Sequence, residues 1–184
     1  FTHAYILGIL GKYEEAMSFY IKALKINPNC GMTHCHLGDI LLTLGYYKEG
    51  LEELEWRFEA MGQQKKFRNR FTNWDKTSNL KNKTVLLFNE QGIGDAIQYC
   101  RYIPRIKSLG CKIFIEIQKE LVVLFEKTVL FDKIIDQDKD VTPDIYHDYA
   151  ISVGSLPHLF DSELNNIPLE PYLTSEAKKL DCEK

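Results

Sequence analysis

Two glycines and an aspartate follow an apolar run in the middle of the chain, a pattern typical of a ligand-binding turn. Residues 85–95 read VLLFNEQGIGD. The four apolar residues predict a buried strand, and Asp95 stands where a helix would begin. Gly92 and Gly94 permit a sharp turn and a close approach of the backbone to a ligand. Because the first amides of a helix are unpaired, such a turn favours an anion.

The common nucleotide-binding versions of this turn do not fit the sequence. The dinucleotide fingerprint needs a third small residue where Ile97 stands, and the Gly-Lys-Ser/Thr run of a P-loop does not follow. Two interpretations stay open for Asp95. It caps the helix by accepting hydrogen bonds from the amides of the first turn, or its carboxylate faces the cleft and takes a proton from a substrate hydroxyl.

A second group of reactive side chains has a simpler explanation. Cys30, His34, Cys35 and His36 lie close enough in the sequence to suggest a metal site. On a helix, however, the two cysteines lie well apart around the axis, and packing already explains the segment. We therefore predict neither a metal nor another cofactor.

The elements around the glycine turn alternate between strands and helices. After the strand at 85–88, the pattern predicts a helix over 95–108, a strand over 112–117 and a helix over 119–127. Shorter strands are expected at 133–135 and 149–153. Such alternation implies right-handed crossovers and a parallel sheet. We predict a small Rossmann-like α/β domain over residues 84–184, with ligands at the C-terminal ends of its strands.

The first third of the chain matches itself when it is shifted by 34 residues. Leu7 falls on Leu41, Gly11 falls on Gly45, and the intervening pattern predicts helices near 2–10, 13–26, 31–44 and 47–60. A 34-residue period is typical of tetratricopeptide repeats. Residues 1–60 are therefore expected to form two helical hairpins, the first truncated. They bind a protein or peptide partner or only scaffold the α/β domain.

Residues 61–83 form a polar and basic linker between these two parts. Its basic and aromatic residues alternate as in proteins that bind single strands of nucleic acid. The chain as a whole carries a net charge of −3, so a solvated linker is the preferred interpretation and no specific nucleic acid partner is expected. The residues in question are Lys65, Lys66, Phe67, Arg68, Arg70, Phe71 and Trp74.

The composition predicts a cytoplasmic protein. Five cysteines are scattered without a C-x-x-C pair, which favours reduced thiols over a disulfide framework. No apolar run approaches the roughly 20 residues that a membrane span needs.

Several short motifs resemble a bacterial family of tetratricopeptide-repeat glycosyltransferase-like proteins. EWRF at 55–58, NWD at 73–75, EQGIGD at 90–95 and RYIP at 101–104 match motifs of that family. SLPHLF at 155–160 and IPLEPYL at 167–173 are similar to its later segments. In that family the glycine turn follows the first strand in the N-terminal half of a GT-B fold. The chain is more distantly similar to heptosyltransferases and O-GlcNAc transferase.

The resemblance implies roles for particular residues. In heptosyltransferases a Gly-Asp pair after the first strand supplies a carboxylate on the acceptor side, so Asp95 is the implied general base. The backbone of the turn would shape the acceptor side, and His158 would lie at the cleft edge, although a surface or packing role is preferred for it. The implied substrate-binding residues are Gln91, Gly92, Gly94, Arg101, Ser155 and His158.

Two functional hypotheses follow from these observations. In the first, the full-length protein transfers a sugar from a nucleotide-sugar donor to a hydroxyl acceptor. A GT-B enzyme binds most of its donor in a second α/β domain, so we expect this chain to be inactive alone and to bind a nucleotide sugar only when such a domain is present. In the second hypothesis, the chain is a non-catalytic repeat adaptor or scaffold.

Overall fold

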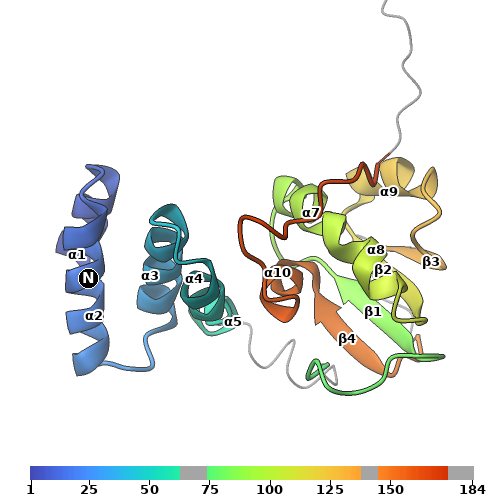
Figure 1. Cartoon of the computed structure of the whole chain (residues 1–184), viewed down its shortest axis with the longest axis horizontal. Helices are drawn as coiled ribbons and strands as arrows, with labels where there is room; N and C mark the ends of the chain where they lie inside the picture. The colour runs from blue at the N-terminus through green and yellow to red at the C-terminus, as the bar shows by residue number, and fades with distance from the viewer. Residues whose placement is uncertain (63–73, 138–144, 174–184) are drawn as a thin grey trace, which may run out of the picture. The chain divides into compact units, whose positions relative to one another are not determined.

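The computed structural model describes residues 1–62, 74–137 and 145–173, which fold into two compact units (Figure 1). One unit comprises residues 1–72 and 155–167, and the other comprises residues 73–154 and 168–184. Residues 63–73 of the predicted basic linker, which include Lys65 to Phe71, lie outside the described residues. Among the helices that are described, none is long and apolar enough to cross a membrane.

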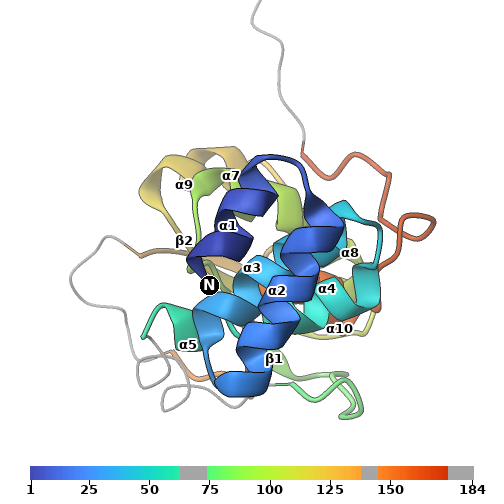
Figure 2. The same ribbon diagram turned by 90° about the vertical axis from the view of Figure 1, so that its left-hand side faces the viewer.

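The first unit is built from helical hairpins, as the 34-residue period predicts. Figure 2 shows this unit from its α1 and α2 side. Gly11 and Gly45 adopt φ angles of 74° and 88°, which glycine tolerates best, and they turn the chain between paired helices. The helices are α1 (Thr2–Ile9), α2 (Tyr13–Ile26), α3 (Gly31–Thr43), α4 (Tyr47–Leu54), α5 (Arg57–Ala60) and α10 (Leu156–Leu159).

Small residues bring the helices of this unit close together. A Cβ on Gly38 of α3 would lie 2.9 Å from the carbonyl oxygen of Gly50 in α4, and a Cβ on Gly50 would lie 2.9 Å from Leu42 Cγ. Glycine is therefore required by the packing of α3 against α4. The core that the first hairpin and α3 share contains Ala4, Leu7, Ala16, Tyr20, Leu37 and Ile40.

The predicted helix over 47–60 is interrupted. It divides into α4 and α5 at Glu55 and Trp56, whose N–H groups bond to carbonyls three positions back, the pattern of a 3-10 turn. The Trp56 ring stacks on the His34 ring, with centroids 4.0 Å apart. His34 contacts the Glu53 carboxylate through Nδ1 and the Pro28 carbonyl through Nε2. Packing on α3 therefore outweighs the helical propensity of residues 47–60.

The second unit contains the predicted parallel sheet. Its strands are β1 (Thr84–Phe88), β2 (Lys112–Ile117), β3 (Lys133–Asp136) and β4 (Tyr149–Ser152), all parallel in the order β3-β2-β1-β4. Central residues such as Leu87 and Ile115 are fully buried. The structure confirms the predicted fold class of helical hairpins followed by a parallel α/β region.

Two aspartates fix the strand register at the N-terminal edge of the sheet. Asp148, just before β4, donates its N–H to the Thr84 carbonyl and accepts the Thr84 N–H on Oδ2, both at 2.8 Å. Asp132, just before β3, forms the same pair of 2.8 Å bonds with Ile113 of β2. Lys83 Nζ lies 3.0 Å from Asp148 Oδ1. The side chains of Asp148 and Asp132 therefore each add one hydrogen bond to the start of a strand pair, β1 with β4 and β2 with β3.

The predicted helix over 95–108 begins earlier and is broken. The segment forms α7 (Ile93–Tyr99), a 3-10 turn η1 (Cys100–Tyr102) and α8 (Ile103–Lys107). The break precedes Pro104, which lacks an N–H and whose ring conflicts with the carbonyl four residues back. The predicted helix over 119–127 is present as α9 (Lys119–Glu126).

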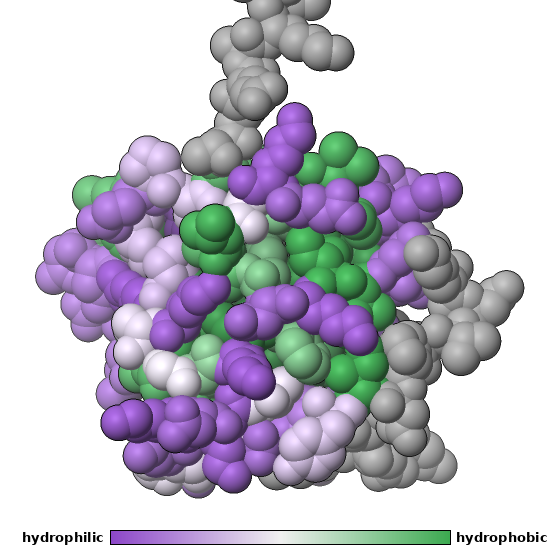
Figure 3. All heavy atoms as spheres, turned by 90° about the vertical axis from the view of Figure 1, so that its right-hand side faces the viewer, coloured by the Kyte–Doolittle hydropathy of each residue, from purple (hydrophilic) through white to green (hydrophobic). Residues whose placement is uncertain are grey.

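The surface of the α/β unit is not uniformly polar. Val123 and Val129 are 66% and 90% exposed. Figure 3 shows one face of the molecule on which hydrophobic residues gather between polar ones.

Candidate functional site

The strand order reverses between β1 and β4, at the C-terminal edge of the sheet. From β1 the chain moves outward to β2 and β3, then returns to the other side of β1 as β4. Ligands of open α/β sheets bind outside the strand ends at such a reversal, because the connections leave in opposite directions there. The segment Asn89–Asp95 follows β1 and therefore lies at this edge, as the sequence predicts.

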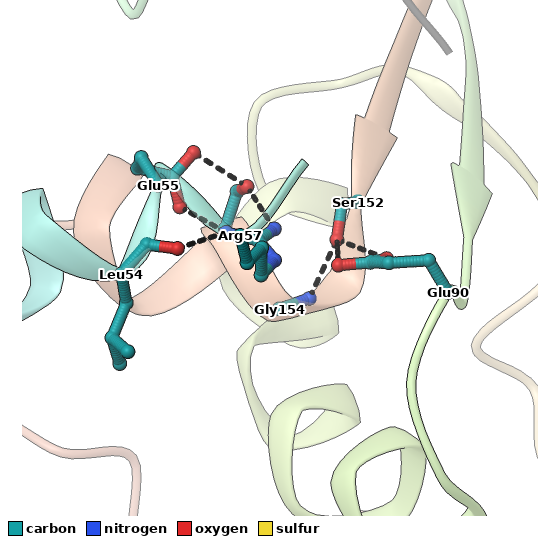
Figure 4. A network of polar contacts seen from close by, with 7 residues as sticks. Leu54, Glu55, Arg57, Glu90, Ser152 and Gly154 are labelled. Atoms are coloured by element: carbon teal, nitrogen blue, oxygen red, sulfur yellow. Dashed lines mark hydrogen bonds and ion pairs between the residues drawn. The ribbon is translucent and has the colours of Figure 1, made fainter. Parts of the chain in front are cut away.

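A glutamate and a serine meet at this edge of the sheet. Ser152, the last residue of β4, donates its hydroxyl to the Glu90 carboxylate at 2.7 Å from Oε1 (Figure 4). The Gly154 N–H in turn donates to Ser152 Oγ at 3.0 Å. Ser152 is 3% exposed and Glu90 is half-buried, so the carboxylate is held by a buried hydroxyl. Sequence reasoning did not select either residue, because only the pairing of β4 with β1 brings them together.

An amide network fixes the start of the turn. Asn89 Nδ2 donates to the Gln91 carbonyl at 2.8 Å and to Gln118 Oε1 at 3.0 Å. Gln118 Nε2 donates to the same Gln91 carbonyl at 2.8 Å. Asn89 Oδ1 is buried and has no hydrogen-bond partner among the described residues. The backbone of Gln91, a predicted substrate-binding residue, is thus held by two side chains.

Asp95 caps α7 from the third position of the helix, not from the N-cap position that the sequence suggests. Gly92 is the N-cap of α7, and its N–H donates to Asp95 Oδ2 at 3.1 Å. A Cβ on Gly92 would lie 3.2 Å from that oxygen, whereas a Cβ on Gly94 would meet nothing within 4 Å. Asp95 is half-exposed, and no hydrogen bond from the described part of the chain reaches its Oδ1. The cap therefore leaves one carboxylate oxygen for a ligand, and the catalytic role of Asp95 stays a prediction.

Arg101, in η1, contacts the segment that follows the sheet. Its guanidinium hydrogen-bonds to Tyr172, whose hydroxyl donates to the Ile97 carbonyl. Burial raises the pKa of the Tyr172 hydroxyl, and the guanidinium opposes that shift. Arg101 Nε is buried and lacks a partner among the residues that the structure covers. The structure shows the contact of Arg101 with Tyr172. The contact of Arg101 with substrate stays a prediction.

Ser155 and His158 belong to the helical unit rather than to the α/β unit. Ser155 Oγ donates to Glu55 Oε2 at 2.8 Å and accepts from Arg57 Nη2 at 2.7 Å. Arg57 is only 4% exposed and also donates to Glu55 Oε1 at 2.7 Å. The Ser155 hydroxyl is thus engaged as donor and acceptor. His158 lies half-buried on α10.

Comparisons with known proteins identify the repeat and one curated relative. Residues 1–30 match the family model of the tetratricopeptide repeat. The chain is 33% identical over 126 residues to protein FlbA of Caulobacter vibrioides, an alignment that covers 65% of this chain and 21% of FlbA. The chain thus spans about a fifth of that relative's length.

One solved structure aligns over much of the chain at a low score. A mutant of Thermobaculum terrenum O-GlcNAc transferase matches with 13% identity and a TM-score of 0.30, covering 72% of this chain and 33% of that one. A TM-score at this level carries no argument about function.

Proposed function

We propose that the α/β unit forms the acceptor side of a glycosyltransferase-like protein that also carries tetratricopeptide repeats. The observation that carries the proposal is the position of two carboxylates, Glu90 and Asp95, on one turn at the strand-order reversal between β1 and β4. The motif resemblance supports the same reaction class. In the full-length protein, a sugar would pass from a nucleotide donor to a hydroxyl acceptor.

The two carboxylates suit different tasks in that reaction. The hydroxyl of Ser152 holds the Glu90 carboxylate at the end of β4, and a carboxylate accepts hydrogen bonds of the kind that the hydroxyl groups of a sugar donate. Asp95 is oriented by the Gly92 N–H through one oxygen, and its other oxygen is positioned to accept a proton from the attacking hydroxyl. Glu90 would orient the acceptor, and Asp95 would act as general base.

The test is transferase activity of the full-length protein, measured as release of the nucleotide from sugar nucleotides in the presence of hydroxyl acceptors. Loss of a general base lowers turnover by about 10²- to 10⁴-fold, so Asp95→Asn should reduce kcat to that extent. Glu90→Gln should mainly raise the KM of the acceptor. Glu126→Gln, at an exposed position of α9 in the same unit, makes the same charge change and is the control that should stay near wild type.

Either of two results would count against this assignment. Full activity of the Asp95→Asn protein would remove Asp95 from the chemistry. A full-length protein that releases nucleotide from no sugar nucleotide would instead favour the second candidate function, a repeat adaptor. That candidate is supported by the repeat match over residues 1–30 and by exposed ring side chains on α1. It expects peptide binding by the helical unit and no dependence on Asp95.

A further inference from the structure

Side chains from Phe1 and from α1, α2 and α3 form a patch of rings beside one carboxylate on the helical unit. The rings of Tyr5 and His36 lie 5.3 Å apart between centroids, and His36 stacks on Tyr20 at 6.0 Å. Phe1 also lies 5.3 Å from His36. Asp39 stands one turn beyond His36 on α3, at the position that corresponds to Tyr5 in the 34-residue period. We call these five residues the aromatic–acidic patch.

The patch is accessible from solvent. Phe1 and Tyr5 are 50% and 45% exposed, and Asp39 is also exposed, while Tyr20 is buried behind them. A partner could therefore reach the rings of Phe1 and Tyr5 and the carboxylate of Asp39. Exposed rings of this size are costly in water unless something covers them.

The carboxylate of Asp39 lacks a compensating charge. It forms no ion pair or hydrogen bond within the described ranges, and neither α1 nor α3 contains a lysine or arginine. Partial burial raises the pKa of the Asp39 carboxyl, and His36 opposes that shift. The Asp39 charge also contributes to a raised pKa of Tyr20, after burial and the effect of Tyr5. An added cation would relieve this uncompensated charge.

A guanidinium fits this combination better than other cations do. It is planar, it stacks on aromatic faces, and its forked donors match a carboxylate. The ammonium of lysine is a compact and strongly hydrated charge that cannot stack in this way. We propose that the aromatic–acidic patch binds an arginine side chain of a peptide partner, with the guanidinium paired to Asp39 and stacked on Tyr5. The inference rests on the adaptor candidate and is independent of the transferase chemistry.

The test is a titration of the isotopically labelled chain, followed by amide chemical shifts in NMR. The probe is Nα-acetyl-arginine methylamide, and its neutral counterpart of the same shape is Nα-acetyl-citrulline methylamide. Arginine should move the signals around Tyr5, His36 and Asp39 and should bind about fivefold more tightly than citrulline, the upper range for an exposed ion pair.

Variants locate the effect on the patch. Asp39→Asn should remove the preference for arginine over citrulline, whereas Glu14→Gln makes the same charge change on exposed α2 and should keep it. Tyr5→Leu should weaken arginine binding by about two- to fivefold through the lost ring contact. Far-ultraviolet circular dichroism checks that each variant retains its helices.

The outcomes separate this inference from the functions proposed above. Equal binding of arginine and citrulline would overturn it, as would an unchanged preference in Asp39→Asn or shifts that map away from α1 and α3. Tighter binding of Nα-acetyl-glutamate methylamide at the same residues would also overturn it, yet would leave peptide binding by the helical unit intact. None of these results bears on Asp95.

Discussion

The contact between α3 and α4 predicts that an alanine at position 38 destabilises the helical unit. A Cβ at Gly38 would lie 2.9 Å from the Gly50 carbonyl oxygen and 3.0 Å from Leu54 Cγ. The oxygen belongs to the backbone of α4, so it cannot move aside without displacing the helix. Gly8, near the C-terminal end of α1, provides the comparison, because its Cβ would meet only the flexible tip of Ile40, at 3.3 Å.

The size of the effect follows from two opposing terms. Alanine in place of glycine within a helix gains about 0.5–1 kcal/mol from reduced backbone entropy. Overpacking of a tight interface costs roughly 1–3 kcal/mol. The Gly38→Ala protein should therefore be about 1–2 kcal/mol less stable than wild type. The Gly8→Ala protein should be within about 0.5 kcal/mol of wild type, because the small clash offsets the gain.

Urea denaturation with a fluorescence signal specific to the helical unit is the appropriate assay. Trp56 lies in the helical unit and Trp74 in the α/β unit, so a Trp74→Phe background leaves Trp56 as the reporter. The midpoint should fall for Gly38→Ala with an unchanged slope. A Gly38→Ala protein as stable as wild type, or an equal loss in Gly8→Ala, would refute the close-approach argument.

Three further predictions concern charged groups. Arg57→Met should lower the free energy of unfolding by about 2–4 kcal/mol in urea denaturation. This is somewhat less than for a fully buried ion pair, because the Glu55 carboxylate is 31% exposed. Lys12→Met, at the surface pair with Glu15, should change the free energy of unfolding by no more than about 0.5 kcal/mol. The Thr84 N–H, with help from Lys83, lowers the pKa of Asp148. The stability that the Asp148 carboxylate provides is therefore present above the usual carboxyl pKa range and is lost as the pH falls below that range. In thermal melts at a series of pH values, Asp148→Asn should make the melting temperature depend less on pH in acid. The raised pKa of Asp39 has the opposite sign, so stability falls as pH rises through and above the usual carboxyl range; Asp39→Asn should melt at a higher temperature than wild type at pH 7, and the difference should vanish in acid.

Much of the fold could be predicted because local patterns decide it. The strand at 112–117 and the helix boundaries around Gly11 and Gly45 follow from apolar periodicity and from glycine at turns, both of which depend on neighbouring residues. The break at Glu55 and Trp56 could not be predicted in the same way. It arises from a ring stacked on His34, more than 20 positions away, and local propensity favours a continuous helix there.

The candidate site shows the same division. The glycine turn depends on residues within one turn of helix, and the sequence predicts its position. The expected N-cap at Asp95 is wrong by three residues, because α7 begins at Ile93 and Asp95 accepts the N–H of Gly92, the N-cap. The contact between Glu90 and Ser152 spans 62 residues and requires β4 to lie beside β1, which alternation of strands and helices does not specify. Ser155 illustrates the converse case. Its motif suggests a ligand contact, but its hydroxyl is engaged by Glu55 and Arg57, about 100 residues earlier.

The helical unit is discontinuous in the sequence, and this has a consequence for its synthesis. Arg57 and Ser155 are 98 residues apart, and the α/β unit is encoded between them. At about 5–20 residues per second, a ribosome needs roughly 5–20 s to produce that interval. During this time the Ser155 hydroxyl, one of the hydrogen-bond acceptors of the Arg57 guanidinium, has not yet been synthesised, although the strands of the sheet have. Completion of the helical unit is therefore a late event, and a chain that stops after residue 62 would retain the repeats without the segment that completes their polar core.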